Sequence, residues 1–284
     1  MKVIFAKCTD AIAYANESKT YGVFHSDVNN GNDTIHVHDC CEIFFCVKGS
    51  GNMFIDEKVY KLNAGDLVVM NQFEAHQISP DANTEFERYA LHIHPSYLYN
   101  VSTEKTDLAR CFKIRNASVS HKSTPTKDKF ERLKLLFEKL ASQADFGDDI
   151  LKNLSATEII TLTNECFKKQ NKEYTYHSPM ENKTVDIAIE YINANYSSTL
   201  NLELVAKNSY VSVNEICRLF RKYLGTTVSK YIMGKRISEA KKMLKGGFTV
   251  LQTSESCGFA DYTSFIRAFK RTVGVAPGKY KKEE

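Results

Sequence analysis

Two segments of the chain, 49 positions apart, have nearly the same sequence. Residues 218–231 read RLFRKYLGTTVSKY, and residues 267–280 read RAFKRTVGVAPGKY. The same offset aligns Ser212 with Asp261 just upstream, and both residue types favour the N-cap of a helix. A duplicated structural unit accounts for this pattern most simply. The carboxy-terminal part of the chain is therefore expected to fold as two copies of one helical motif.

The spacing of apolar residues in each copy predicts an amphipathic helix with one buried and one outward face. Ile216, Leu219 and Phe220 recur at three- and four-residue steps in the first copy, as do Phe265 and Phe269 in the second. The opposite faces carry Asn214, Cys217, Arg218 and Arg221 in the first copy and Thr263, Ile266, Arg267 and Lys270 in the second. A shorter helical stretch and a tight turn precede each copy. This order is the helix-turn-helix plan, in which the second helix enters the major groove of DNA.

The segment between the copies predicts a long connecting helix. A helix over residues 227–245 would be about 28 Å long at ~1.5 Å per residue. Successive major-groove faces of B-DNA lie about 34 Å apart. A rod of this length can therefore hold two reading helices on adjacent turns of a duplex. Gly225 and Gly274 lie where the second helix of each copy should end, at a position that favours a residue with left-handed backbone conformation.

The charge of the chain is concentrated in the same region. From residue 184 onward there are 16 Lys and Arg against 9 Asp and Glu, whereas residues 1–183 hold 22 against 25. A basic half is suited to a polyanionic partner such as DNA. The alternative is an all-helical packing domain whose arginines are only solvated. The eight cysteines lack any C-x-x-C pair and no signal peptide is recognised, which favours the cytoplasm.

The stretches LNLELVAKNSYVSVNEICRLFRKYLGTTVSKYI, KRISEAKKML and CGFADYTSFIRAFKRTVGVAPGKY are specific enough to indicate a family. Residues 184–282 resemble the DNA-binding domain of the AraC/XylS family of transcriptional regulators. The resemblance implies that bases are contacted by Asn214, Cys217, Arg218, Tyr262, Thr263, Ile266 and Arg267. We expect Arg218 and Arg267 to grip guanine, because a guanidinium bonds both O6 and N7. Phosphate contacts are expected from Ser212, Arg221, Lys222, Lys230, Lys270, Arg271 and Lys279.

The amino-terminal half is typical of a β-domain. Over residues 1–115, short apolar or alternating runs are separated by the turn signals NNGND, KGSGN, NAGD and SPDAN, with no helix expected between them. This spacing predicts a sandwich or small barrel. Apolar residues then recur at helical spacing over 126–170, which predicts two helices, and the polar stretch 171–183 reads as a linker before the helical domain 184–284. In AraC-type relatives the corresponding helices dimerise, whereas packing on their own barrel is the alternative.

Histidines and a glutamate of this β-domain are expected to point into one barrel together. HVHDCCEIFFCVKG places His36, His38 and Glu42 at H-x-H-x3-E, and His76 follows in GDLVVMNQFEAHQ. These stretches resemble the two cupin motifs, in which such residues hold a divalent metal. Three readings stay open here: a metal site, a metal-free ligand pocket, or structural histidines. The effector-binding residues expected from strand parity are Phe24, His36, His38, Glu42, Phe44, His76 and Tyr89. A further alternating pair, His92 and His94, is interpreted as strand packing.

The sequence thus predicts an α+β multidomain protein. A cupin-like β-barrel or jelly roll with two following helices precedes an all-α domain with two helix-turn-helix motifs on a long helix. The function expected is that of an effector-controlled, DNA-binding transcriptional activator, not an enzyme. It would be a homodimer that contacts RNA polymerase, with no required cofactor and no membrane partner. The competing hypotheses are a metal-dependent cupin enzyme with an appended helical domain, and a helical interaction module that binds no nucleic acid.

Overall fold

The computed structural model divides the chain into two compact units. It describes residues 2–29, 37–55, 58–82, 84–113, 120–142, 146–168, 183–224, 226–273 and 275–281. The first unit comprises Met1–Asn32, Cys40–Asn71 and Ile78–Met180. The second comprises Glu181–Glu284 with two short segments of the first half, Asp33–Asp39 and Gln72–Gln77. The expected linker 171–183 lies outside the described residues, except for Lys183.

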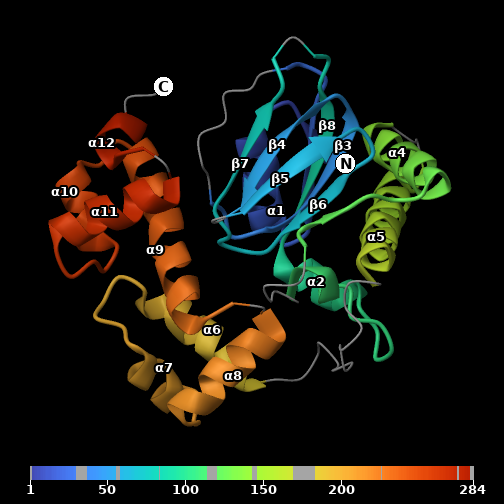
Figure 1. Ribbon diagram of the computed structural model, residues 1–284. Coiled ribbons are helices and arrows are strands. Elements are labelled where there is room, and N and C mark those ends of the chain that lie inside the picture. The colour runs from blue at the N-terminus through green and yellow to red at the C-terminus, as the bar shows by residue number, and fades with distance from the viewer. Residues whose placement is uncertain are drawn as a thin grey trace. The chain divides into compact units, whose positions relative to one another are not determined.

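The amino-terminal half combines nine strands with five helices in the part of the chain that is described (Figure 1). The strands are β1 (Ile4–Phe5), β2 (Tyr21–Ser26), β3 (Cys41–Lys48), β4 (Ser50–Ile55), β5 (Lys58–Asn63), β6 (Leu67–Met70), β7 (His76–Pro80), β8 (Glu87–Ile93) and β9 (Lys122–Ser123). The helices are α1 (Cys8–Ser18), α2 (Pro95–Val101), α3 (Arg110–Lys113), α4 (Lys127–Ala141) and α5 (Asp148–Phe167). The six-stranded sheet runs β1-β2-β8-β3-β6-β9 and the three-stranded sheet runs β5-β4-β7.

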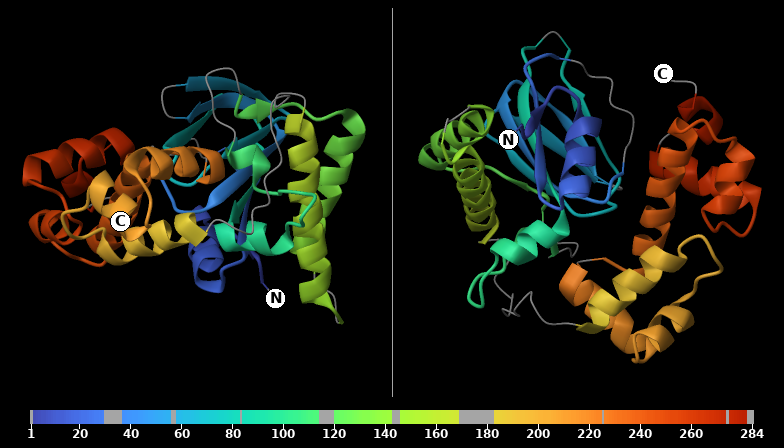
Figure 2. Two further views of the ribbon diagram at one scale, coloured as in Figure 1. Left: turned by 90° about the horizontal axis from the view of Figure 1, so that it is seen from below. Right: turned by 180° about the vertical axis from the view of Figure 1, so that it is seen from behind.

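Strand register assigns each side chain of the larger sheet to one of two faces. Phe45 pairs with Tyr89, and their shared face is packed beneath α4, where Phe137 stacks on both rings at centroid distances of 5.6 and 4.8 Å. Figures 1 and 2 show α4 and α5 lying against this side of the sheet. Phe44 pairs with Ala90 and points the other way, toward the three-stranded sheet.

A second apolar core fills the space between the two sheets. Phe44, Val68 and Met70 of the larger sheet cluster with Met53 and Ile55 of β4, and all five are buried. Alternation of side chains along each strand therefore supplies two cores, one under the helices and one between the sheets. This arrangement confirms the expected cupin-like double-sheet architecture.

Two features of this half differ from the sequence prediction. The helix α1 lies between β1 and β2, so the expectation of no helix was wrong. Its buried residues are the alanines Ala11 and Ala15, which leave only a weak hydrophobic pattern. The helix approaches β2 so closely that a Cβ at Gly22 would meet the backbone of Ala11. In addition, β9 pairs with β6 beyond residue 115.

The carboxy-terminal helices form two similar groups, one at each end of a long helix (Figure 1). They are α6 (Lys183–Asn195), α7 (Leu202–Asn208), α8 (Val213–Leu224), α9 (Val228–Lys245), α10 (Val250–Ser256), α11 (Tyr262–Val273) and α12 (Pro277–Tyr280). The helix α9 has 18 residues and is about 27 Å long, close to the length expected from the sequence. None of the helices in the described ranges is both long enough and apolar enough to cross a membrane.

The repeated residues hold equivalent places in both groups. Phe220 contacts Tyr231 edge-on at 5.8 Å, and Phe269 contacts Tyr280 edge-on at 5.5 Å. These two pairs are related by the 49-residue offset, so the repeat preserves an aromatic contact that anchors each second helix. Gly225 and Gly274, the expected left-handed helix ends, lie outside the described residues.

Helix caps and turns complete each unit. Ser212 Oγ accepts a hydrogen bond from the Glu215 amide at 3.2 Å, and Asp261 Oδ1 accepts one from the Ser264 amide at 2.8 Å. Both predicted N-caps are therefore confirmed. The turn before α8 covers 209–212 and the turn before α11 covers 257–261, so the second is one residue longer. The buried Thr253 of α10 donates its hydroxyl to the Thr249 carbonyl, which satisfies that polar group.

The second turn depends on Gly258, which we expect to be far more sensitive than Gly247. Both adopt a left-handed φ, of 73° and 90°. A Cβ at Gly258 would collide with the Tyr196 carbonyl oxygen, whereas one at Gly247 would meet nothing within 4 Å. Gly247→Ala should cost about 1–2 kcal/mol from backbone strain, and Gly258→Ala about 1–3 kcal/mol more from overpacking. Urea unfolding of the full chain measures both, and equal midpoints for the two variants would contradict this account.

Candidate nucleic-acid interface and ligand site

The second helix of each unit presents a polar, partly basic face to solvent. In α8, Ile216, Leu219 and Phe220 are buried while Asn214 and Arg218 are exposed. Cys217 is half-buried. In α11, Phe265, Ala268 and Phe269 are buried. Its predicted base-contacting residues Tyr262, Thr263 and Arg267 are exposed and Ile266 is half-buried. The helical periodicity of the sequence therefore gave the buried and outward faces of both helices as the structure has them.

Arg218 is held by a neighbour that sequence reasoning missed. Its Nε and one terminal nitrogen donate to the Glu215 carboxylate at 2.8 and 2.6 Å. These hydrogen bonds lower the pKa of Glu215, so the carboxylate stays ionised. The i, i+3 spacing of the two residues was the signal that could have revealed the pair. A base contact by Arg218 requires its guanidinium to share or leave this carboxylate.

The residues expected to contact phosphate are mostly at the surface. Lys222 is half-buried, and the others are exposed: Ser212, Arg221, Lys230, Lys270, Arg271 and Lys279. Lys230 lies in the first turn of α9, and Arg271 and Lys270 in the last turn of α11. Cations on exposed helix ends can reach a sugar-phosphate backbone without entering a groove. Their roles remain predictions.

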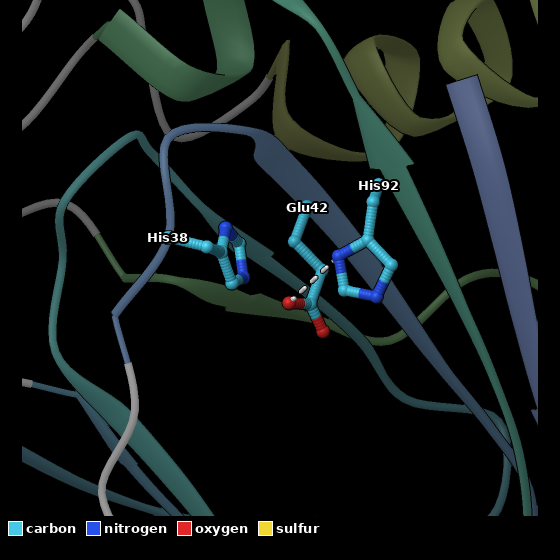
Figure 3. A group of neighbouring side chains, drawn as sticks. All are labelled: His38, Glu42 and His92. Carbon is cyan, nitrogen blue, oxygen red and sulfur yellow. Dashed lines mark ion pairs between the residues drawn. The ribbon is translucent and has the colours of Figure 1, made fainter. Parts of the chain in front are cut away.

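In the amino-terminal half, three predicted or neighbouring side chains converge between the sheets (Figure 3). His38 precedes β3, Glu42 lies on β3, and His92 lies directly opposite Glu42 on β8. All three are buried, and their ligand atoms lie within 4.8 Å of one another. His92 Nδ1 is 3.5 Å from a Glu42 carboxylate oxygen. His92 Nε2 is 3.3 Å from Cys8 Sγ on α1.

The other residues expected to bind the effector lie in two places: on the sheet face that carries Glu42, and beside His38. Phe24, Phe44 and Glu42 belong to the same face of the sheet, since their register partners are Ala90 and His92. His76 lies beside His38, with ring centroids 5.0 Å apart, and its Nδ1 is 2.8 Å from the Glu74 carbonyl oxygen. His36 lies outside the described residues.

Tyr89 does not join this group. It lies on the opposite face of the sheet, where its ring stacks on Phe137 and on His25. Strand parity explains this, because residues 89 and 90 alternate across the sheet. Burial raises the pKa of Tyr89 to about 12. The expectation that Tyr89 shares a pocket with Glu42 is therefore wrong, and His92, which the sequence had assigned to strand packing, lies beside Glu42 instead.

Comparison with known proteins agrees with this two-part organisation. The family described as AraC-like ligand binding domain matches residues 26–160, and the family described as helix-turn-helix domain matches residues 205–283. The chain belongs to the AraC/XylS family of transcriptional regulators. It is thus a DNA-binding regulator with a ligand-binding domain. Regulators of this kind are not enzymes.

Relatives match most of the chain at low identity. The lactose operon transcription activator of Staphylococcus xylosus is 21% identical over 278 residues, which are 97% of this chain and 91% of that protein. The regulator YdiP of Escherichia coli is 24% identical over 250 residues, 87% of this chain and 80% of YdiP. ToxT of Vibrio cholerae with a bound unsaturated fatty acid has the same fold, with a TM-score of 0.58 at 16% identity over 92% of this chain and 95% of ToxT.

The outward face of α8 predicts different effects for Arg218 and Lys222. Arg218→Ala should remove about 1–3 kcal/mol of discrimination at one base pair. Lys222→Ala should weaken binding to all duplexes alike and lower the salt slope by about 1. Fluorescence anisotropy with a selected duplex and single-base variants of it, at several salt concentrations, measures both. If Arg218→Ala keeps the full preference of the parent protein, α8 does not read bases in the way described.

Proposed function

We propose that this regulator is a sequence-specific transcriptional activator whose affinity for its operator is set by a small molecule bound in the amino-terminal domain. The observation that carries the proposal is the pair of capped helices α8 and α11, each with one anchored apolar face and one solvent-exposed face carrying an arginine. Two such helices on one connecting helix favour two neighbouring major-groove contacts. Activation rather than repression is favoured by the lactose operon activator of S. xylosus.

We propose that DNA bases are contacted by Asn214, Cys217 and Arg218 in the first unit and by Tyr262, Thr263, Ile266 and Arg267 in the second. Backbone phosphates would be contacted by Ser212, Arg221, Lys222, Lys230, Lys270, Arg271 and Lys279. A DNA partner favours a cytoplasmic location, and activation would proceed through contact with RNA polymerase, as the family resemblance implies.

The proposed effector is a small, hydroxyl-rich metabolite of the sugar class. Buried polar groups on the Glu42-bearing face supply hydrogen-bonding partners for hydroxyls: His38, Glu42 and His92 in one cluster and Arg88 further along β8. Arg88 lies over the rings of Phe24 and Phe86, each 5.4 Å from the guanidinium carbon. An apolar surface beside polar groups suits the two faces of a sugar ring. The apolar cluster of Phe44, Met53 and Met70 favours a fatty acid as the second candidate, as in the ToxT complex.

A probe panel tests the effector class on the full chain. We expect lactose, galactose or glucose to raise the melting temperature of the parent protein and to change its affinity for a selected duplex. Glu42→Gln should abolish both responses, because a neutral amide accepts weaker hydrogen bonds from effector hydroxyls than an ionised carboxylate does. His25→Gln, on the other face of the same sheet, should leave them unchanged. A response to oleate alone would overturn the sugar assignment and leave DNA binding standing.

We further propose that the regulator is a homodimer joined through α4 and α5. Large apolar side chains are exposed on this pair: Leu135 at 43%, Ile150 at 60%, Leu151 at 53% and Leu154 at 62%. Ile150, Leu151 and Leu154 share one face of α5 at helical spacing. An apolar strip on an amphipathic helix pair fits a second copy of the same strip, which a two-fold axis supplies.

The dimer assignment predicts a charge-sensitive interface. Leu154→Glu should convert the protein to a monomer in analytical ultracentrifugation, because a carboxylate would be buried opposite its own copy. Lys139→Glu, an exposed change on α4, should leave the mass unchanged. A monomeric parent protein, or a dimeric Leu154→Glu variant, would rule out this interface.

A further inference from the structure

The cluster of His38, Glu42 and His92 has the composition of a metal-binding site. Two imidazoles and one carboxylate form the ligand set of several zinc enzymes and of non-haem iron centres. None of the three residues is more than 4% exposed. Buried carboxylates and imidazoles in such proximity are arranged either as hydrogen-bonded pairs or around a cation. The distances between them fit the second arrangement.

The Glu42–His92 separation matches two ligands of one ion better than a direct hydrogen bond. An N–H···O hydrogen bond is usually 2.7–3.2 Å long, and here Nδ1 and the carboxylate oxygen are 3.5 Å apart. Two ligand atoms each about 2.0–2.1 Å from one ion, at the tetrahedral angle, lie about 3.4 Å apart. His38 completes the set within 4.8 Å.

The surroundings of His92 also suit coordination. Cys8 Sγ lies 3.3 Å from Nε2, the ring nitrogen that does not face Glu42. An Nε2–H donated to this sulfur fixes the tautomer with the lone pair on Nδ1, as outer partners of metal-bound histidines do. His76 is beside His38, and a hydrogen bond from its Nδ1 to the Glu74 carbonyl would likewise leave the lone pair on Nε2. These contacts orient rings that would otherwise rotate.

We propose that His38, Glu42 and His92 bind one divalent transition-metal ion of the Zn²⁺ or Fe²⁺ class. This set differs from the one inferred from the sequence, because His92 on β8 supplies a ligand outside the H-x-H-x3-E motif. Three protein ligands leave at least one coordination position open. A hydroxyl or carboxylate oxygen of an effector fits that position. This inference deepens the proposed effector site, because it uses the same three residues. Metal binding needs neither effector, DNA nor dimer formation, so a metal titration can fail while the proposed function stands.

The test is a Co²⁺ titration of the full chain after removal of metal with a chelator. We expect one equivalent to bind with the visible absorption of low-symmetry Co²⁺, to be displaced by Zn²⁺, and to be unaffected by excess Mg²⁺, which prefers oxygen ligands. Glu42→Gln and His38→Gln should each weaken binding at least tenfold. His25→Gln is the matched control, since His25 and Glu87 form a half-exposed pair at 3.4 Å on neighbouring strands of the same sheet.

Two results would overturn the proposal: no binding of Co²⁺ or Zn²⁺ by the parent protein at millimolar metal, or full binding by both variants. Circular dichroism checks that each variant folds. If Glu42→Gln does not fold, His38→Gln decides alone, because His38 precedes β3 and lies outside the sheet ladder. A further readout is the melting temperature, which Zn²⁺ should raise in the parent protein and in His25→Gln but not in His38→Gln.

Discussion

The DNA-binding half depends on an aromatic contact that the sequence repeats. Phe220 against Tyr231 and Phe269 against Tyr280 fix the buried faces of α8 and α11 at the same point of each unit. Because a helix has only one face opposite its buried one, anchoring these phenylalanines also decides where Arg218 and Arg267 point. Both copies of the repeat therefore keep the same buried helix face and the same outward-pointing arginine.

The amino-terminal half follows from a different constraint, the two-residue alternation of strands. One face of the six-stranded sheet carries a large apolar core that is covered by α4 and α5, with the half-exposed His25–Glu87 pair also on that face. The other face has an apolar part against β4 and β5 and a polar part with Glu42 and His92. The same sheet thus carries the helix-covered apolar core on one face and a buried polar cluster, the proposed ligand site, on the other.

Features that depend on local periodicity could be predicted from the sequence. Features that depend on contacts between residues distant in sequence could not. Buried and exposed faces of α8 and α11 and their caps Ser212 and Asp261 could be predicted because each depends on residues three or four positions apart. The helix α1 could not, since its buried residues are alanines that give little hydrophobic contrast. Nor could the placement of His92 directly opposite Glu42, which requires the register of β8 against β3. Glu215 was overlooked although its spacing from Arg218 was visible.

The central claim is that two anchored helices read two successive major grooves. Methylation interference on a duplex selected from a random library tests it most directly, because methylation of guanine N7 blocks the major-groove atom that an arginine grips. We predict two clusters of interfering guanines on one face of the duplex, centred about 10 base pairs apart. A single cluster, or interference confined to adenine N3 in the minor groove, would contradict the account.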